Sequence, residues 1–254
     1  MPSRAVRRLL VTSRAGRAQA AAELRLTVRR GDSVLLNLAI PVGLLVFFSL
    51  VDVLPKPAGV TDAVTFLTPG ILALAIMSTA MVSLGIATGF ERQYGVLKRL
   101  GSTPLGRPAL LAAKTAAVIA VEILQVLVLV AVGVALGWRP HGDPALAVAA
   151  ALLATVAFAG VGLLMAGALR AEVTLAAANG AYLVLLLLGG MVFPLAKLPP
   201  GLRQFAEGLP AGALSDALHA SLSAGASVPA RAWVVLAVWA LVAPLAAAAT
   251  FRWE

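Results

Sequence analysis

Long apolar runs separated by short polar stretches dominate the hydrophobic pattern of this chain. About 20 mostly apolar residues are needed for a helix to cross the hydrocarbon core of a bilayer. Six runs are candidates for such helices, at residues 34–51, 63–90, 109–138, 144–169, 173–196 and 232–251. The runs are continuous, and lipid offers no partner for free backbone groups, so they predict helices and not the alternating strands of a β-barrel. We therefore expect an all-α membrane protein with six transmembrane helices.

Composition supports lipid as the solvent of these helices. The 254 residues are 61% hydrophobic and 12% charged, whereas soluble domains carry roughly 25% charged residues. The formal charge of +9 does not indicate nucleic-acid binding, because the basic residues concentrate in the first thirty positions and at the ends of apolar runs. The chain has no Cys, which excludes disulfides, thiolate metal sites and a Cys nucleophile.

The distribution of Lys and Arg predicts the orientation of the helices. If the amino terminus is cytoplasmic, fifteen of the twenty Lys and Arg residues lie on the cytoplasmic side, as the positive-inside rule requires. Six spans then return the carboxyl terminus to the cytoplasm. Trp138, Trp233 and Trp253 stand at span ends, where indole rings typically anchor helices at the membrane interface.

We expect one domain over residues 1–254, because no internal repeat or low-complexity linker divides the chain. Residues 1–33 form a cytoplasmic arm, whose second half has the pattern of an amphipathic helix along the membrane surface. Residues 34–251 form the six-span bundle. Within it, residues 194–231 form an outer segment with two short amphipathic helices, which either lie on the surface or dip into the membrane and return.

Motifs for chemistry within the chain are absent. No Lys follows a Gly, so there is no Walker A loop for ATP, and neither an HExxH zinc motif nor a GxSxG nucleophile motif occurs. We expect no metal site, and His141 and His219 are interpreted as solvated residues of outer loops. The chain is therefore not expected to be an enzyme.

A charged, turn-rich patch lies between the second and third apolar runs, with the sequence ERQYGVLKRLGSTPLGRP at residues 91–108. Gly95 loosens the chain, and a short amphipathic helix follows it. We expect its apolar and basic residues to lie on opposite faces, with Val96, Leu97 and Leu100 against Lys98 and Arg99. Held at both ends by membrane helices, such a helix can act as a cytoplasmic lever. The alternative is a solvated inner loop that merely follows the charge rule.

The longer string ERQYGVLKRLGSTPLGRPALLAAK resembles the conserved loop of permease subunits of ABC-2-type transporters, and more narrowly those of daunorubicin-resistance-like drug and lipid efflux systems. Ten residues fit the family pattern: Glu91, Arg92, Gly95, Leu97, Arg99, Leu100, Thr103, Pro104, Leu105 and Lys114. Ala113 departs from it, because the family usually has Gly before that Lys. The six runs, the amphipathic arm and the outer string FPLAKLPPGL also fit, so the resemblance covers nearly the whole chain.

The resemblance implies the transmembrane permease of a bacterial ABC exporter that moves an amphipathic or lipid-like substrate outward across the plasma membrane. A separate ATPase subunit would bind ATP and Mg, and two permease copies would face each other in the lipid bilayer. The coupling helix to the ATPase would comprise Glu91, Arg92, Gly95, Leu97, Lys98, Arg99 and Leu100. The alternatives are a non-transporting membrane scaffold or, with less support, an intramembrane enzyme.

Polar residues within the apolar runs are the other candidates for function. A charge on Glu122 is costly in lipid, so this residue is expected to face protein or water, or to be protonated. It either acts on a substrate or gate, or it is a neutral acid hydrogen-bonded to a neighbouring helix near Asn179. Asn37, Thr79 and Ser83 either line a pathway or join helices by hydrogen bonds.

A gate is the last element that the resemblance implies. The fifth run breaks at Gly189-Gly190 and Pro194, where an upper gate and a re-entrant segment would begin. The candidate gate residues are Leu188, Met191, Val192 and Phe193, for which plain packing is the alternative.

Overall fold

The structure is a computed structural model that describes residues 19, 22–23, 31–51, 62–101, 106–223 and 227–250. Every regular element in these ranges is helical, which confirms the all-α prediction. The elements are α2 (Gly31–Leu50), α3 (Ala63–Met77), η1 (Ser78–Ser83), α4 (Leu84–Gln93), α5 (Val96–Gly101), α6 (Arg107–Ala135), α7 (Pro144–Ala168), α8 (Ala171–Leu188), η2 (Leu195–Lys197), α9 (Pro200–Glu207), α10 (Pro210–Ser221) and α11 (Ala230–Thr250).

The second apolar run forms one continuous helix of 31 residues, made of α3, η1 and α4. Its α3 part is apolar all round and almost completely buried, as expected for the core helix of a bundle. The η1 part is π-helical, a form whose backbone hydrogen bonds join residues five positions apart instead of four. Short π-helical stretches inside α-helices are often found at functional sites, and this one carries the candidate residue Thr79.

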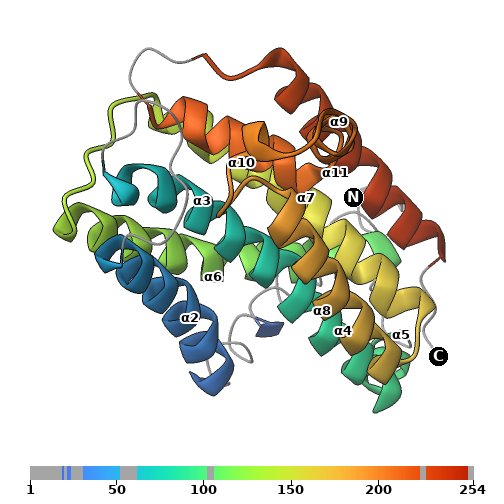
Figure 1. The fold of residues 1–254 in the computed structure, drawn as a ribbon. Coiled ribbons are helices and arrows are strands. Elements are labelled where there is room, and N and C mark those ends of the chain that lie inside the picture. Colours follow the sequence, from blue (N-terminus) through green and yellow to red (C-terminus); the bar gives the residue numbers. More distant parts are fainter. Residues whose placement is uncertain are drawn as a thin grey trace, which may run out of the picture.

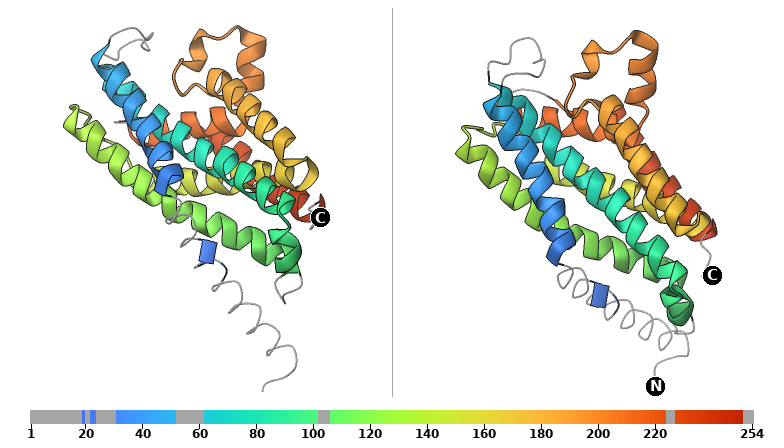
Figure 2. Two further views of the ribbon diagram at one scale, coloured as in Figure 1. Left: turned by 90° about the horizontal axis from the view of Figure 1, so that it is seen from below. Right: turned by 60° about the horizontal axis from the view of Figure 1, so that its bottom comes forward.

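The remaining helices pack around α3 and α7. The largest interface joins α7 to α11, and α7 also contacts α4, α10 and η1 (Figure 1). On the other side, α2 packs on α3 and α6. The short α10 packs between α3, α7 and α11, and the placement of the outer helices on or within the membrane stays a prediction. By contrast, α9 projects from the bundle and exposes most of its residues (Figure 2).

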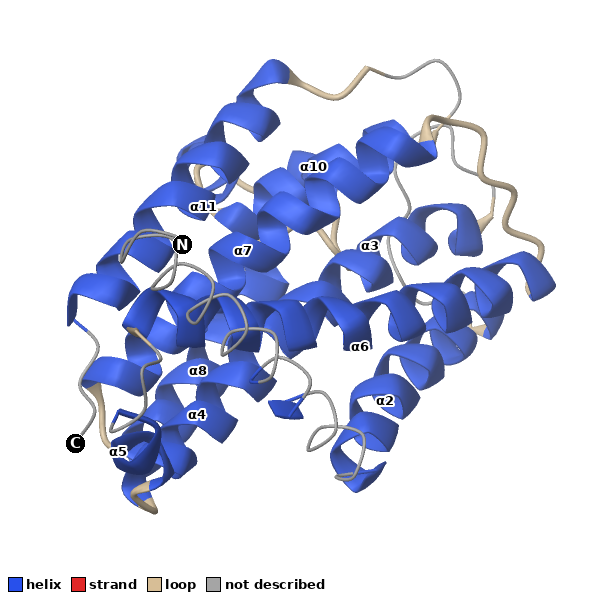
Figure 3. Cartoon of the chain, turned by 180° about the vertical axis from the view of Figure 1, so that it is seen from behind, coloured by secondary structure: helices blue, strands red, loops and turns tan. Residues whose placement is uncertain are grey.

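The bundle has two distinct ends, which we call the α5 end and the α9 end. At the α5 end, α4 is followed by α5, and the turn between α7 and α8 lies close by (Figure 3). The start of α2 and the end of α11 also lie toward this end (Figure 2). At the α9 end lie α9, η2 and the connection between α6 and α7. Successive long helices alternate in direction, which is the arrangement expected of a chain that crosses a membrane repeatedly.

Most of the predicted spans correspond to helices. Five helices in the described part of the chain are long and apolar enough to cross a membrane, and α2 contributes a shorter apolar stretch, Leu35–Leu50. The count of six spans and their orientation stay predictions. The fifth predicted run was too long, because α8 ends at Leu188 and the chain turns at Gly189 and Gly190. The predicted amphipathic helix at 18–31 lies largely outside the described residues.

Candidate functional site

The predicted short helix after the long second helix is present. The long helix ends at Gln93, the chain turns at Tyr94 and Gly95, and α5 begins directly afterwards. Gly95 has a positive φ of 71°. A side chain strains this conformation, so Gly95 determines where α4 stops and α5 starts.

The side chains of α5 divide between a buried and an exposed face. Leu97 is fully buried and Leu100 half-buried, whereas Lys98 and Arg99 are exposed, as predicted. Val96 was expected on the buried face, but it is 42% exposed because it occupies the first position of the helix, directly after the turn. The exposed surface of α5 is therefore basic with an apolar edge.

Glu91 and Arg92 belong to the last turn of α4, and Glu91 forms part of a buried ion cluster. Its carboxylate lies 2.6 Å from Lys114 Nζ of α6, and Glu23 lies 3.0 Å from the same nitrogen. The side chains are 14% exposed for Glu91, 11% for Glu23 and 2% for Lys114. Buried charges are tolerated when they are paired in this way. The cluster therefore joins the end of α4 to α6 and to the amino-terminal arm.

The next two residues of α4 hold the turn between α7 and α8. Arg92 donates hydrogen bonds to the carbonyl oxygens of Gly167, at 2.5 Å, and Leu169. A cation there also satisfies carbonyl groups that the end of α7 leaves without a helical partner. Gln93 Nε2 donates to Glu172 Oε1 at 2.7 Å, in the first turn of α8. Three consecutive residues of α4 thus bind three different parts of the bundle.

The polar residues predicted inside the apolar runs gather into a second cluster. Thr79 Oγ1 donates to Gln125 Oε1 at 2.9 Å, and Gln125 Nε2 donates to the carbonyl oxygen of Asn37 at 2.8 Å. Ser83 Oγ donates to Asn37 Oδ1 at 3.1 Å. The hydrogen bonds join α2, η1 and α6. A cavity of about 80 Å³ is lined by Asn37, Thr79 and Ser83 at one part and by Lys114 at another.

Glu122 precedes Gln125 by three residues on α6, but it bonds to α7 and does not take part in the hydrogen bonds of this cluster. Its Oε2 atom lies 2.5 Å from Thr155 Oγ1 of α7, while its Oε1 atom has no hydrogen-bond partner within the described part of the chain. The expected proximity to Asn179 was wrong, because Asn179 is exposed on α8 and donates to the carbonyl of Leu175 in its own helix. The register of α7 brings Thr155 to Glu122 instead.

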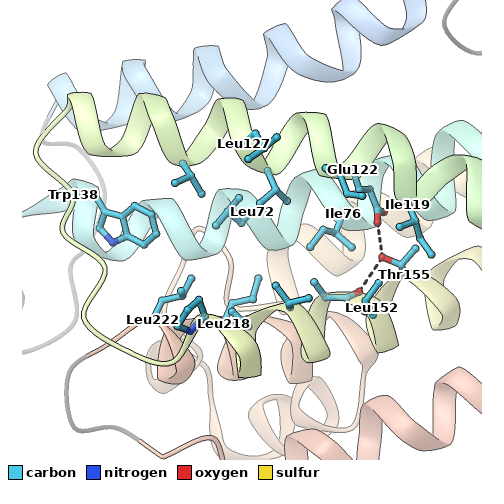
Figure 4. A pocket seen from close by; sticks show the side chains of 17 residues that line it. Leu72, Ile76, Ile119, Glu122, Leu127, Trp138, Leu152, Thr155, Leu218 and Leu222 are labelled. Atoms are coloured by element: carbon cyan, nitrogen blue, oxygen red, sulfur yellow. Dashed lines mark hydrogen bonds between the residues drawn. The ribbon is translucent and has the colours of Figure 1, made fainter.

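Glu122 lines an elongated apolar pocket of about 320 Å³ between α3, α6, α7 and α10. Figure 4 shows Glu122 and Thr155 at one end of the pocket and Trp138 at the other. Trp138 is only 2% exposed, so its prediction as an interfacial anchor was wrong. The chain turns back after α6 ends at Ala135. This turn brings the indole of Trp138 into the pocket lining, together with Leu218 and Leu222.

Comparison with known families identifies the chain. The family described as "ABC-2 type transporter" matches residues 17–222, which is most of the sequence. The chain belongs to the ABC-2 type transporter family. A comparison with curated proteins gave no significant match. Together with the apolar helices, the family makes the chain a multi-pass membrane protein and the transmembrane permease of an ABC-type transporter, which works with an ABC ATPase subunit.

The candidate gate residues of the permease lie together at the end of α8 but in unlike surroundings. Met191 is fully buried, and its carbonyl oxygen lies so close to α3 that a Cβ on Gly70 would be 1.9 Å away. Leu188 is half-buried, and Phe193 is 40% exposed. The backbone after α8 is therefore wedged against the core helix, and a gating role for these residues stays a prediction.

One histidine of the permease was misinterpreted from the sequence. His141 is exposed as expected, but His219 is packed within the bundle at the α9 end. Its ring stacks on Phe66 with centroids 4.7 Å apart, and Nε2 lies 2.9 Å from the Phe66 carbonyl oxygen. Burial lowers the pKa of His219, while hydrogen bonds to the carbonyls of Ser215 and Phe66 oppose that shift.

Several contact residues were missed because their partners are remote in the sequence. Glu23 looks like one polar position of an amphipathic arm, and Thr155 like an isolated polar residue in an apolar helix. Gln93 and Glu172 appear as ordinary residues of two polar loops. Lys114, a basic residue within an apolar run, was the one signal that pointed to acidic partners.

Proposed function

We propose that this permease exports an amphipathic or lipid-like substrate across the bacterial plasma membrane, driven by a separate ATPase subunit. ATP and Mg would be bound by that subunit. The α5 end faces the cytoplasm in this proposal, with both termini on the same side, and the α9 end faces outward. The positive-inside rule supports this orientation, because the basic residues of α5 and the arm then lie inside.

One observation carries the proposal: α5 exposes a basic surface while the residues just before it are fastened to the bundle. Lys98 and Arg99 are exposed, and Tyr94 is 72% exposed beside them. An apolar and basic patch of this kind suits a groove on a partner protein, because aromatic and cationic side chains dominate such contacts. We propose that the ATPase binds here.

The connections of α4 explain how motion of α5 would reach the spans. A displacement of α5 acts on Glu91, Arg92 and Gln93 together, and hence on α6, on the end of α7 and on the start of α8. Because packed helices shift as rigid bodies, a small movement at α5 is passed along whole helices. The transport cycle then requires that different nucleotide states of the ATPase favour different arrangements of these helices.

We further propose that two permease copies enclose the transport path. In one copy, α2 and α8 flank the long second helix on different sides, α2 against α3 and α8 against α4 and η1. A second copy facing these helices would place Asn37 and Ser83 near the shared axis, where they can contact a polar group of the substrate. Both α2 and α8 expose many apolar side chains that either lipid or the second copy would cover.

The test is copurification of the permease with its ATPase from native membranes, followed by ATP hydrolysis of the complex in nanodiscs. We expect a protein with a Walker A motif to copurify, and Arg99→Glu to remove both it and the hydrolysis. Arg139→Glu is the matched control, since Arg139 is an exposed basic residue at the α9 end, and it should behave like wild type. If Arg99→Glu retains the ATPase and full hydrolysis, α5 is not the coupling site. If no ATPase copurifies with the wild type, the scaffold interpretation is favoured.

A further inference from the structure

The pocket beside Glu122 has the properties of a ligand site that is separate from the proposed transport path. We propose that it binds a lipophilic amine, which enters from the lipid between α6 and α7 and donates a hydrogen bond to Glu122. This inference does not depend on the proposed exporter function. It concerns the purified permease alone.

The shape of the pocket suits a small amphipathic molecule. Its volume of about 320 Å³ lies at the lower end of the range of roughly 300–1,000 Å³ found for small-molecule sites. Apart from Glu122 and Thr155 its lining is almost entirely aliphatic or aromatic (Figure 4). Several lining residues are exposed at the surface of the bundle, namely Ile123, Leu127, Val148 and Leu152. In a membrane these residues face lipid, so the pocket opens sideways into the bilayer.

The polar end of the pocket has an unused acceptor. Glu122 is 6% exposed and Thr155 1% exposed, yet Oε1 of Glu122 has no hydrogen-bond partner among the described residues. Leaving such a group unpaired in an apolar site is unfavourable, because the group loses its hydrogen bonds to water and gains none in return. A ligand that donates a hydrogen bond to Oε1 removes this penalty when it binds.

Hydrogen-bond geometry also indicates where the proton of Glu122 lies. Thr155 Oγ1 is 2.5 Å from Glu122 Oε2 and 2.9 Å from the carbonyl oxygen of Ala151. A hydroxyl has one hydrogen, and the Ala151 carbonyl can only accept. We therefore infer that Thr155 donates to Ala151 and accepts from a protonated Glu122. The proton of Glu122 is thus held on Oε2, and Oε1 remains an acceptor.

An amine fits this arrangement better than an alcohol or a carboxylate. A neutral amine that enters from lipid donates an N–H to Oε1, and its nitrogen lone pair can take the proton from Glu122 Oε2. The product is an ammonium–carboxylate pair with no change in net charge, and Thr155 then donates to the carboxylate. Charge-assisted hydrogen bonds of this kind are about twice as strong as neutral ones. An alcohol cannot accept this proton at a comparable cost, and a carboxylate has no hydrogen to donate to Oε1.

The position of Glu122 separates this pocket from the cluster at Asn37. Gln125, only three residues further along α6, bonds across to α2 and η1, whereas Glu122 bonds to α7. The two polar groups therefore bond to different neighbouring helices. An occupant of the pocket would wedge against α6 and α7 and would not contact Asn37.

The test uses Trp138, which lines the far end of the pocket, as a fluorescent reporter in purified permease. Trp233, Trp239 and Trp253 are replaced by Phe so that only Trp138 emits. The probes are dodecylamine, dodecanol and dodecanoate, each brominated at the end of the alkyl chain so that it quenches a nearby indole. We expect the amine to quench Trp138 at concentrations at least tenfold lower than the carboxylate and the alcohol.

Three variants decide the outcome. Glu122→Gln should abolish the preference for the amine, whereas Asn179→Leu, which removes an intramembrane polar group elsewhere, should leave it unchanged. Ala151→Phe, which fills the pocket, should abolish quenching at low concentration by all three probes. Equal quenching by the three probes in the wild type would overturn the proposal. So would a preserved amine preference in monodisperse Glu122→Gln or, should that variant not fold, in Ala151→Phe.

Discussion

Lys114 and Glu122 are two charged residues on the same apolar helix, eight positions apart, and the structure treats them in opposite ways. Lys114 is 2% exposed and lies within 3.0 Å of two carboxylates. Glu122 is nearly as buried, but only one of its oxygens is hydrogen-bonded, to Thr155, and the other has no partner among the residues that the structure describes. Burial alone therefore does not distinguish a structural ion pair from a binding group. The number of charged side-chain atoms that have a hydrogen-bond or ion-pair partner does distinguish them.

The difference assigns different roles to the two halves of α6. A fully paired cation fixes the geometry of the helices that supply its partners, and so Lys114 forms a joint between α4, α6 and the amino-terminal arm. A half-paired acid does not hold helices together strongly, and it keeps free capacity for a ligand. On this account, loss of Lys114 should damage the fold, and loss of Glu122 should damage binding.

The largest effect is expected at Lys114. Lys114→Met leaves two buried carboxylates without their cation, and breaking a buried pair in this way typically costs about 3–5 kcal/mol. The free energy of unfolding in mixed micelles measures the loss. Adding Glu91→Gln to Lys114→Met should recover part of it, because one of the stranded charges is then removed. A single variant as stable as wild type would show that the cluster is not a joint.

A smaller loss is expected at Arg92, which ties α4 to the end of α7. Arg92→Gln removes charge-assisted hydrogen bonds to two carbonyl oxygens, worth about 1.5–3 kcal/mol in typical cases. Arg92→Lys should lose less, since it keeps the charge but not the planar fork that reaches both oxygens. Thermal unfolding of the two variants side by side gives the comparison. If both variants are as stable as wild type, the hydrogen bonds of Arg92 do not stabilise the bundle.

Replacement of Glu122 should not lower the free energy of unfolding, in contrast to replacement of Lys114. Glu122→Leu removes an acid with an unpaired oxygen from an apolar environment, while Thr155 keeps the carbonyl of Ala151 as its acceptor. We expect the free energy of unfolding to stay unchanged or to rise by up to about 2 kcal/mol. A destabilisation as large as that of Lys114→Met would mean that the two residues have the same role.

The smallest effect concerns His219, a half-buried titratable group at the other end of the bundle. Burial lowers its pKa, so between the folded value and about 6.5 the unfolded chain binds more protons than the folded one. Stability should therefore fall as pH drops through this window, by less than about 1.4 kcal/mol per pH unit. The neighbouring Asp216, whose pKa is raised by burial, acts in the opposite direction.

Comparison of wild type with His219→Gln isolates the histidine, because Asp216 is present in both. Unfolding curves between pH 7 and pH 5 should show a steeper decline for wild type than for the variant. Parallel declines would show that His219 does not titrate differently in the folded and unfolded chains.

The helices could be predicted well from the sequence because each one is a local property of a continuous apolar run. The turn at Gly95 and, apart from Val96, the two faces of α5 were also predictable, since Gly and the pattern of apolar and basic residues act over a few positions. The break after α8 was predicted at Gly189-Gly190, although the apolar run that was taken as the fifth span continues past these glycines to Ala196.

The contacts of the site were less predictable, because they depend on which helix faces which. The sequence shows that Lys114 and Glu122 need partners, but not that these are Glu23, Glu91 and Thr155. Likewise, nothing local to α10 shows that His219 packs on α3. Such pairings are decided by helix rotation and register, which are set by packing across the whole bundle.

The central claim is that α5 lies in the cytoplasm and couples the permease to its ATPase. Since the chain has no Cys, Lys98→Cys and Arg139→Cys give single labelling sites at the two ends of the bundle. A membrane-impermeant maleimide applied to intact cells should label Cys at 139 and not at 98, and inverted vesicles should give the reverse. In those vesicles, bound ATPase should slow the reaction of the maleimide with Cys at position 98. Labelling of position 98 from outside intact cells would contradict the account.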